Sequence, residues 1–231
     1  MIISHTHKFI FIKTQKTAGT SLEIGLSRFC GPRDVITPIL PADEEIRRSL
    51  GYAGPRNYLV PFSRYALGDW GRFLVRRKGR LRFFNHISAR EIRRLVDPEV
   101  WNTYFKFCFE RNPWDKVVSM YFWKNRSEPR PTLSEYIQSG RANVATLRGG
   151  FDLYSIDGEV VVDRVCRYEC MKQELEFLAE RLALPEMPQL PRAKGEHRTD
   201  RRHYRDLLTA ADREKIAKVF AREIAHFGYE Y

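Results

Sequence analysis

Residues that suit anion chemistry follow the first long apolar run of the chain. The run from Lys8 to Lys13 is rich in Ile and Phe, which is typical of a buried strand, and a helical apolar pattern begins at Leu22. Between them lies the string Lys16-Thr17-Ala18-Gly19-Thr20-Ser21. Backbone N–H groups converge on such a loop, and the dipole of the following helix favours negative charge. Since Lys16 adds a cation and its neighbours add hydroxyl groups, we expect the ligand to be a phosphate or a sulfate.

The order of residues in this loop differs from that of ordinary nucleotide-hydrolysing proteins. A Walker A loop places its lysine directly after the last glycine and before Ser or Thr. Here Lys16 precedes Gly19 by three residues, and the pattern GxxxxGK[ST] occurs nowhere in the chain. From this loop alone, a plain turn between a strand and a helix, with a solvated lysine, is an equal alternative.

A second junction between a strand and a helix carries an arginine and a serine. Residues 104–109 are apolar and aromatic, which predicts a buried strand, and Arg111 follows them. Asn112 is a suitable helix N-cap, with Pro113 in the first helical position. Ser119 lies about two turns further along the helix. We expect the forked guanidinium of Arg111 and the hydroxyl of Ser119 to point at one anion.

A histidine between the two junctions is the candidate general base. Residues 81–84 are predicted to form a strand, and a helix is predicted to begin near Ser88, which fits a capping box with Glu91. His86 then lies at the C-terminal end of a strand, where open α/β sheets bind ligands. Its ordinary pKa near neutrality suits a general base, although a lone histidine more often has a structural role.

The two junctions together resemble those of sulfotransferases that use 3′-phosphoadenosine-5′-phosphosulfate (PAPS). The loop from Lys16 to Ser21 is similar to the 5′-phosphosulfate loop of that family. The pattern F-x-R-N-P-W-D-x-V-V-S, which spans 109–119, is similar to its 3′-phosphate element, including the spacing of eight residues between Arg111 and Ser119. Residues 85–93, the following Trp101 and the closing 227–229 resemble bacterial members related to uronyl and heparan 2-O-sulfotransferases.

The resemblance covers most of residues 8–231, is weakest across 32–80, and implies a role for each matching residue. It implies that Lys16 is the lysine of the phosphosulfate loop, and that Arg111 and Ser119 bind the 3′-phosphate. The residues that match the backbone cradle of the loop are Thr17, Ala18, Gly19, Thr20 and Ser21. His86 matches the catalytic base of the uronyl branch, whereas other branches use a glutamate. The glutamates that stay open for this role are Glu44, Glu45 and Glu91, with Glu23 poorly placed because it lies a turn or more into the first helix.

A basic loop at 194–202 precedes the last helix. In the family this position resembles a flap that closes over the nucleotide. Lys194 and Arg198 are therefore candidate donor-binding residues, and a solvated run of charge is the alternative.

Composition bounds the fold and the compartment. The 231 residues are enough for one α/β domain with a large core, and no break in composition argues for two. The resemblance implies that this is a single sulfotransferase domain over 1–231, with a P-loop-like, three-layer fold whose central, mainly parallel sheet is flanked by helices. The net charge of +11 favours anionic ligands without choosing among them.

The sequence shows no sign of a membrane span or of a signal peptide. No apolar run approaches the ~20 residues of a membrane span. Residues 1–5 lead straight into the first strand, which leaves no room for a signal peptide. With four cysteines and no CxxC spacing, buried thiols in a reducing cytoplasm are expected rather than disulfides or a zinc site.

The remaining elements are predicted from periodicity and turn signals. Residues 32–80 form an irregular segment in which aromatic residues alternate with arginines, and we interpret it as substrate-facing, with a plain surface layer as the alternative. Asp157-Gly158 marks a hairpin within 154–162, and a core strand is expected from Arg164 to Glu169. The helices are predicted at 20–29, 42–50, 132–137, 171–184 and 209–226. The last of them has an apolar stripe that should pack on the sheet, formed by Ile216, Val219, Phe220 and Ile224.

These patterns predict transfer of a sulfuryl group from PAPS to a hydroxyl of an acceptor, with a sugar favoured. No metal and no nucleic-acid partner are expected, and no cluster of metal ligands is recognisable. A P-loop nucleotide or small-molecule kinase is one alternative, weakened by the position of Lys16 and by the lack of a strand that ends in a Walker B-like carboxylate. A non-catalytic protein that binds nucleic acid or an acidic glycan is the other, and it rests on charge and on the aromatic and basic segment 52–82.

Overall fold

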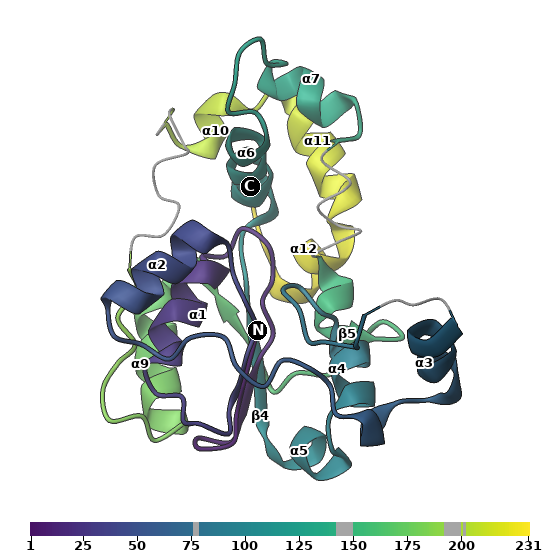
Figure 1. Ribbon diagram of the computed structural model, residues 1–231. Helices are drawn as coiled ribbons and strands as arrows, with labels where there is room; N and C mark the ends of the chain where they lie inside the picture. Colours follow the sequence, from purple (N-terminus) through teal and green to yellow (C-terminus); the bar gives the residue numbers. More distant parts are fainter. Residues whose placement is uncertain (76–78, 142–149, 192–199, 201) are drawn as a thin grey trace.

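A five-stranded sheet lies at the centre of the protein, and helices cover both of its faces (Figure 1). The computed structural model describes residues 1–75, 79–141, 150–191, 200 and 202–231. The strand order is β3-β1-β2-β4-β7, where β2, β4 and β7 are parallel and β1 runs antiparallel to both of its neighbours. The strands are β1 (Ile2–Ser4), β2 (Phe9–Phe11), β3 (Val35–Ile36), β4 (Phe105–Glu110) and β7 (Arg164–Arg167). The prediction of an α/β fold with a mainly parallel sheet is confirmed.

The alternation of side chains along the strands separates two apolar layers. Phe9 and Phe11 of β2 face one side, where they pack with Phe107 of β4 and with the leucines of α1 (Gly19–Ser27) and α9 (Met171–Arg181). Ile10 and Ile12 face the other side, which α4 (Ala89–Leu95) and α5 (Pro98–Thr103) cover. Because successive side chains of a strand point to opposite faces, both faces of β2 are buried and the loop that follows it is held rigidly.

The other helices lie around this three-layered centre. Figure 1 shows α6, α7, α10 and α11 gathered beyond one end of the strands, and the third apolar cluster is formed between them. Their bounds, with those of the helices not yet named, are α2 (Pro41–Ser49), α3 (Leu67–Trp70), α6 (Pro113–Lys124), α7 (Leu133–Gln138), α10 (Tyr204–Leu207), α11 (Ala210–Val219) and α12 (Ala221–Phe227). Among the described residues, no helix combines the length and the apolar character that crossing a bilayer requires.

Several local predictions are confirmed. The side chain of Ser88 caps α4, that of Asn112 caps α6, and that of Thr209 caps α11. The Asp157-Gly158 turn joins β5 (Ser155–Ile156) to β6 (Glu159–Val160), with positive φ at both turn residues. These features depend on contacts within a few residues, so the local sequence specifies them.

The prediction that residues 1–5 only lead into the first strand is wrong. Ile2–Ser4 is itself a strand, β1, and pairs antiparallel with β2. Asp34 fixes the turn between them, because its carboxylate accepts hydrogen bonds from Ser4 Oγ at 2.9 Å and from the backbone N–H of His5 at 2.7 Å. The candidate anion loop therefore follows the second strand of the sheet.

Residues 81–84 do not form a strand of the sheet. They make one isolated bridge, between Leu59 and Arg82, flanked by backbone bonds to Tyr58 and Val60. The segment pairs with its neighbour in the layer above the sheet, because its buried residue, Phe83, packs onto the apolar side chains of that layer. The composition of residues 81–84 is typical of a strand, but the segment pairs with residues 58–60 instead of with a strand of the central sheet.

The predicted last helix is interrupted, and it does not pack on the sheet. Phe220, with φ −108° and ψ 27°, separates α11 from α12. Ile216 and Phe220 pack against Val117 and Tyr121 of α6. Other elements already cover both faces of the sheet, so this apolar stripe is buried between helices instead.

The helix predicted at 42–50 is confirmed as α2, and segment 32–80 is more regular than predicted because it also contains β3 and α3. The predicted core strand 164–169 is shorter, because β7 ends at Arg167. Glu169 lies in a 3₁₀ turn before α9, and its carboxylate accepts a hydrogen bond from the backbone N–H of Asn112 at 2.6 Å.

Candidate functional site

The loop between β2 and α1 has an unusual backbone. Lys16 and Ala18 both have positive φ, 60° and 58°, a conformation that costs a residue with a side chain roughly 1–2 kcal/mol. No side chain caps α1, and its first turn contains no acidic residue. Backbone N–H groups in such a turn at a helix N-terminus suit an anion, and strain of this kind is typical of functional loops.

Two threonines attach this loop to the neighbouring strand. The hydroxyl of Thr14 donates to the carbonyl oxygen of Phe109 at the end of β4, and it lies 2.9 Å from the hydroxyl of Thr17. Both threonines are buried. The hydroxyl of Thr17, expected to contact the anion, therefore holds the loop in place, and only its backbone is left for the expected role.

Gly19 is required by the side chain that passes it. A Cβ at this position would lie 2.8 Å from Lys13 Cγ and 3.2 Å from the carbonyl oxygen of Thr14. Lys13 takes this path to reach Glu23, whose carboxylate its Nζ contacts at 2.8 Å. The glycine thus permits a buried ion pair directly beneath the loop.

We expect Gly19→Ala to lower the free energy of unfolding by about 1–3 kcal/mol, because the new methyl group has no space. Gly71→Ala is the matched control, since Gly71 has helical φ and no atom within 4 Å of the added Cβ. Urea titrations of both variants measure the difference. An unchanged midpoint for Gly19→Ala would contradict the crowding described here.

Arg111 connects the two sequence motifs directly. Its Nη1 donates to the carbonyl oxygen of Lys16 at 3.0 Å, and its Nε and Nη2 donate to Asp115 Oδ2 at 2.9 and 2.6 Å. The guanidinium also lies over the ring of Tyr168, 4.2 Å from its centroid. The structure therefore brings Lys16 and Arg111 together, although 95 positions separate them in the sequence.

One face of α6 continues this contact. Asp115, Ser119 and Trp123 are spaced four residues apart, so they share a face of the helix, and all three are partly exposed. Arg111 contacts the first of them, and Lys16 Nζ lies 5.5 Å from the ring centroid of the last. Ser119, between these two contacts, therefore faces the loop. Sequence reasoning missed Trp123 and Tyr168, for which no local signal exists, whereas the spacing of four from Arg111 could have identified Asp115 as its partner.

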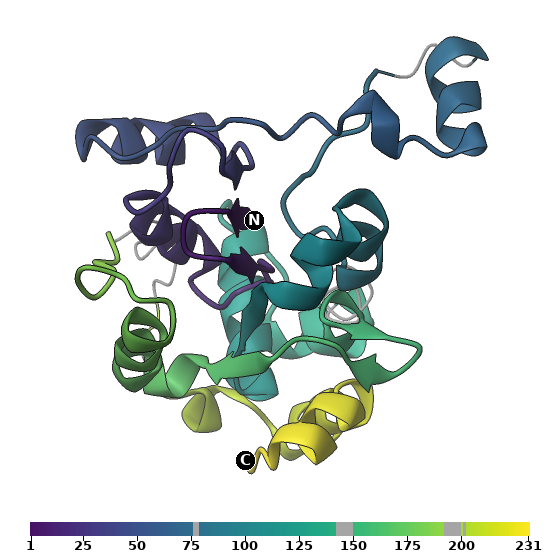
Figure 2. The ribbon, with the colours of Figure 1, turned by 90° about the horizontal axis from the view of Figure 1, so that it is seen from below.

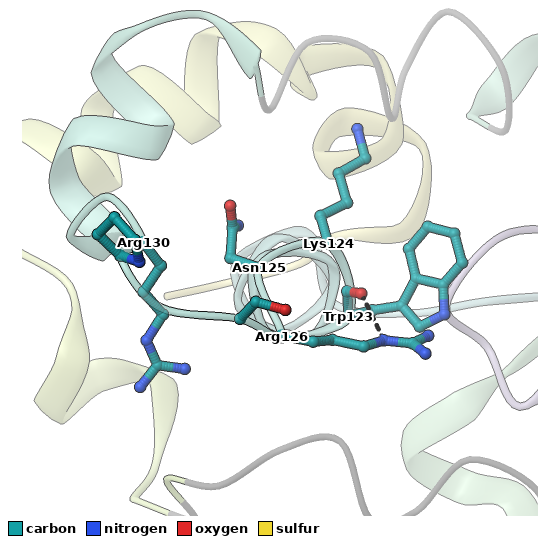
Figure 3. A pocket seen from close by; sticks show the side chains of 7 residues that line it. Trp123, Lys124, Asn125, Arg126 and Arg130 are labelled. Carbon is teal, nitrogen blue, oxygen red and sulfur yellow. Dashed lines mark hydrogen bonds between the residues drawn. The ribbon is translucent and has the colours of Figure 1, made fainter.

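A pocket of about 510 Å³ opens at the C-terminal end of α6 (Figure 3). Trp123 belongs both to this pocket and to the contact with Lys16. Arg126 lies beside it, with the guanidinium 5.5 Å from the ring centroid and Nε donating to the carbonyl oxygen of Trp123 at 3.0 Å (Figure 3). The lining residues are Trp123, Lys124, Asn125, Arg126, Ser127, Pro129 and Arg130. An aromatic ring that lies close to two cations, in a basic pocket, suits an anionic or sugar-like ligand.

His86 lies at the start of the loop, although the strand predicted to position it is absent. Its Nδ1 is 2.9 Å from the carbonyl oxygen of Lys13, so Nδ1 carries the proton and Nε2 is the basic atom. Its φ of 60° adds another strained residue to this region. Burial and the charge of Lys13 lower the pKa of His86 to about 4. The imidazole is thus neutral, and able to accept a proton, at physiological pH.

The low pKa of His86 predicts a pH effect on stability. An unfolded chain binds a proton at this histidine near pH 6.5, whereas the folded protein does so near pH 4, so stability is lost as the pH falls through this interval. We expect the free energy of unfolding to fall more steeply between pH 7 and pH 5 in the wild type than in His86→Asn. Urea titrations at both pH values test this, and parallel losses would show that His86 is not responsible.

The glutamates considered as alternative bases are engaged elsewhere. Glu23 is fully buried, and its oxygens lie 2.8 Å from Lys13 Nζ, the Met1 amine and the hydroxyl of Thr37. Burial alone raises the pKa of Glu23, but the positive charges of the Met1 amine and Lys13 outweigh it and lower the pKa to about 2. Such a carboxylate is structural. The other three bond to neighbours outside the loop: Glu44 to Arg47 and Ile39, Glu45 to Arg48, and Glu91 to Ser88.

Two predicted features remain, namely the donor-binding residues of the basic loop and the expected lack of a metal site. Lys194 and Arg198 lie outside the described residues. Within the part of the chain that the structure describes, no three His, Cys, Asp or Glu side chains come together in a way that could hold a metal ion.

Comparison with known proteins finds a related protein, but that protein does not indicate an activity for this chain. An uncharacterized protein of Archaeoglobus fulgidus is 33% identical over 100 residues, which are 41% of this chain and 81% of the archaeal protein. The chain belongs to the same family as that protein. No protein-family model matches the chain. No solved structure is similar to it.

Proposed function

We propose that the protein is a sulfotransferase with a P-loop-like fold that moves a sulfuryl group from PAPS to an acceptor hydroxyl. The hydrogen bond from Arg111 to the carbonyl oxygen of Lys16 is the observation that carries this proposal. It joins a lysine-bearing anion loop to the arginine of the second motif, so that one donor molecule with two anionic ends can contact both. The sequence resemblance to PAPS-dependent enzymes supplies the identity of that donor.

The residues of the loop and of α6 fit such a donor. The phosphosulfate group would lie at the N-terminus of α1, against the backbone from Thr17 to Ser21, with Lys16 neutralising the charge that grows on the bridging oxygen. Arg111 has five N–H groups, of which three make the bonds described above, and two more are available to a 3′-phosphate. Ser119 lies on the same face of α6 and adds a hydroxyl. Asp115 and Tyr168 hold the guanidinium in its orientation.

His86 is the proposed general base. Its Nε2 would take the proton of the attacking hydroxyl while the Nδ1–H bond to Lys13 fixes the ring. Charge is spread over the moving group and the leaving oxygen in such transfers, so positioning and electrostatics dominate the rate.

The pocket at the end of α6 is the proposed acceptor site, because Trp123 connects it to Lys16. The Trp123 ring suits the face of a sugar, and Arg126 and Arg130, which also line the pocket, suit its anionic groups. This assignment differs from the sequence interpretation, which gave the acceptor to segment 32–80. Initial rates with Arg126→Ala would show a raised acceptor KM and an unchanged donor KM.

Arg111→Lys is expected to weaken PAPS binding by about tenfold to a hundredfold, because a lysine cannot form the forked bonds to Asp115 and the Lys16 carbonyl. Ser119→Ala removes one hydroxyl and is expected to cost only about three- to tenfold. Arg213→Lys is the matched control, since Arg213 also stacks on a tyrosine, Tyr231, at 4.6 Å. Calorimetric titration with PAPS measures all three. Equal affinities for wild type and Arg111→Lys would remove Arg111 from the donor site.

A comparison of donors tests the proposed function itself. PAPS is expected to raise the melting temperature, whereas ATP with Mg²⁺ leaves it unchanged, and labelled PAPS then identifies acceptors. The opposite ranking would favour the kinase alternative.

One observation bears on the kinase alternative. Contrary to the sequence interpretation, β4 does end in a carboxylate, that of Glu110. However, Glu110 is buried, and Lys116 Nζ at 2.7 Å and Tyr154 OH at 3.1 Å both donate hydrogen bonds to its carboxylate. Salt-sensitive binding of polyanions without any transfer would favour a non-catalytic binder.

A further inference from the structure

A small helical unit projects from the body of the protein. Residues 62–75, which include α3 and the π-helical turn Gly71–Val75, lie at the edge of the molecule in Figure 1 and far from the sheet in Figure 2. Four aromatic rings pack on one another inside the unit, with Phe62 stacked on Trp70 at 5.4 Å between centroids. The rings are those of Phe62, Tyr65, Trp70 and Phe73. The aromatic residues of this segment therefore face each other rather than a substrate.

The unit is fastened to the body by polar contacts. Asp69 accepts a hydrogen bond from Arg94 of α4 at 2.7 Å, while the backbone N–H of Ala66, inside the unit, donates to the same carboxylate at 3.0 Å. Tyr65 accepts a bond through its hydroxyl from the backbone N–H of Leu81 at 2.7 Å. These contacts give the unit a defined orientation.

The unit exposes three large apolar side chains. Leu67 is 92% exposed, Val75 82% and Leu74 64%, which are the largest exposures among the large hydrophobic residues described. Leu67 begins α3, and Leu74 and Val75 end the π-helical turn that follows it, so all three belong to the same short projecting unit. We call Leu67, Leu74 and Val75 the apolar tip. Exposed apolar groups that are displayed together in this way mark interaction surfaces.

Charge selects the kind of partner. Among the described residues of 62–82, four arginines stand against one aspartate, Asp69; they are Arg64, Arg72, Arg80 and Arg82. A second copy of the chain, docked tip to tip, would bring these like charges together, because a twofold interface pairs a surface with itself. An anionic lipid bilayer matches both features, since its headgroups attract arginine and lysine while its acyl region accepts leucine and valine.

We propose that the apolar tip inserts into the surface of a membrane that contains anionic lipids and attaches the protein there peripherally. Leu67, Leu74 and Val75 enter the boundary between headgroups and acyl chains. Arg72, which is exposed on the π-helical turn between them, pairs with lipid phosphates. The attachment does not depend on the proposed transfer reaction.

Vesicle flotation of the full-length protein tests this proposal. We expect the wild type to float with vesicles of phosphatidylcholine and phosphatidylglycerol, and to float less as salt increases. Leu67→Ser/Val75→Ser keeps the net charge and is expected to bind about tenfold more weakly or worse. Leu40→Ser/Leu50→Ser is the matched control, because these leucines are also exposed but lie at the two ends of α2, on the opposite side of the molecule (Figure 1).

The outcomes separate the occupants of the tip. Loss of flotation in the tip variant alone, with melting temperatures and PAPS binding unchanged, supports the proposal. If the wild type does not float, the tip is not a membrane contact. If the tip variant floats as well as the control, the tip is again not the contact, and the net charge of +11 explains the binding of the protein to the vesicles. A concentration-dependent dimer that only the tip variant abolishes would also overturn the proposal, because the occupant is then a second copy.

Discussion

Replacing Lys16 with methionine is expected to lower the rate of sulfuryl transfer by about a hundred- to a thousandfold, the usual cost of removing one preorganised electrostatic contact to developing charge. Methionine keeps an unbranched apolar stem against Trp123, where Lys16 Nζ lies 5.5 Å from the ring. It also meets the same positive φ as lysine, so the backbone cost does not change. The substitution therefore removes the charge and keeps the unbranched stem. Single-turnover transfer from labelled PAPS measures the effect.

Lys172→Met is the control for this substitution, because Lys172 is exposed on α9, where its Nζ lies near the carboxylate of Glu176. We expect the control to keep wild-type turnover, and both variants to keep the wild-type melting temperature. Undiminished turnover in Lys16→Met would remove the lysine from the reaction. A large drop in its melting temperature would instead assign Lys16 a structural role.

His86→Asn is expected to lower kcat by about a hundred- to ten-thousandfold while leaving the affinity for PAPS unchanged. Asparagine tolerates the φ of 60° better than most residues, and its amide can donate to the Lys13 carbonyl, but it cannot take a proton. The wild-type kcat/KM should keep its acidic limb near pH 4, because the pKa of His86 is lowered to about 4 by burial and by Lys13. Stopped-time assays across pH 4–9 measure both effects.

His7→Asn is the matched control, since His7 Nδ1 also lies within hydrogen-bond distance of a backbone carbonyl oxygen, that of Leu182, at 3.1 Å. It precedes β2, at the opposite end of the strand from the loop. A loss of PAPS affinity in His86→Asn, with kcat preserved, would make His86 a donor contact instead of a base. An acidic limb near pH 6.5 would contradict the burial of the imidazole.

Much of the architecture could be predicted because it depends on neighbours in the chain. Asn112 and Pro113 specify the start of α6, and Asp157-Gly158 specifies a hairpin, through bonds that span only a few residues. The alternation of Phe9, Ile10 and Phe11 predicts a strand buried on both faces. The predictions that are wrong concern segments whose contacts are with residues distant in the sequence. Residues 81–84 have the composition of a strand but pair with 58–60 above the sheet, and the stripe of α11 packs on α6 because other elements already cover both faces of the sheet.

The candidate site divides in the same way. The amino-acid sequence by itself determined the two candidate anion motifs, because a lysine, a glycine and hydroxyl residues after an apolar run, and an arginine before a capped helix, are local patterns. Only the tertiary structure decided that Arg111 bonds the carbonyl of Lys16, that Trp123 lies beneath Lys16, and that Glu23 is buried in ion pairs. Those contacts arise because β2 and β4 are parallel neighbours, which places the loops at their C-terminal ends side by side, and strand pairing between segments almost a hundred residues apart leaves no local signal.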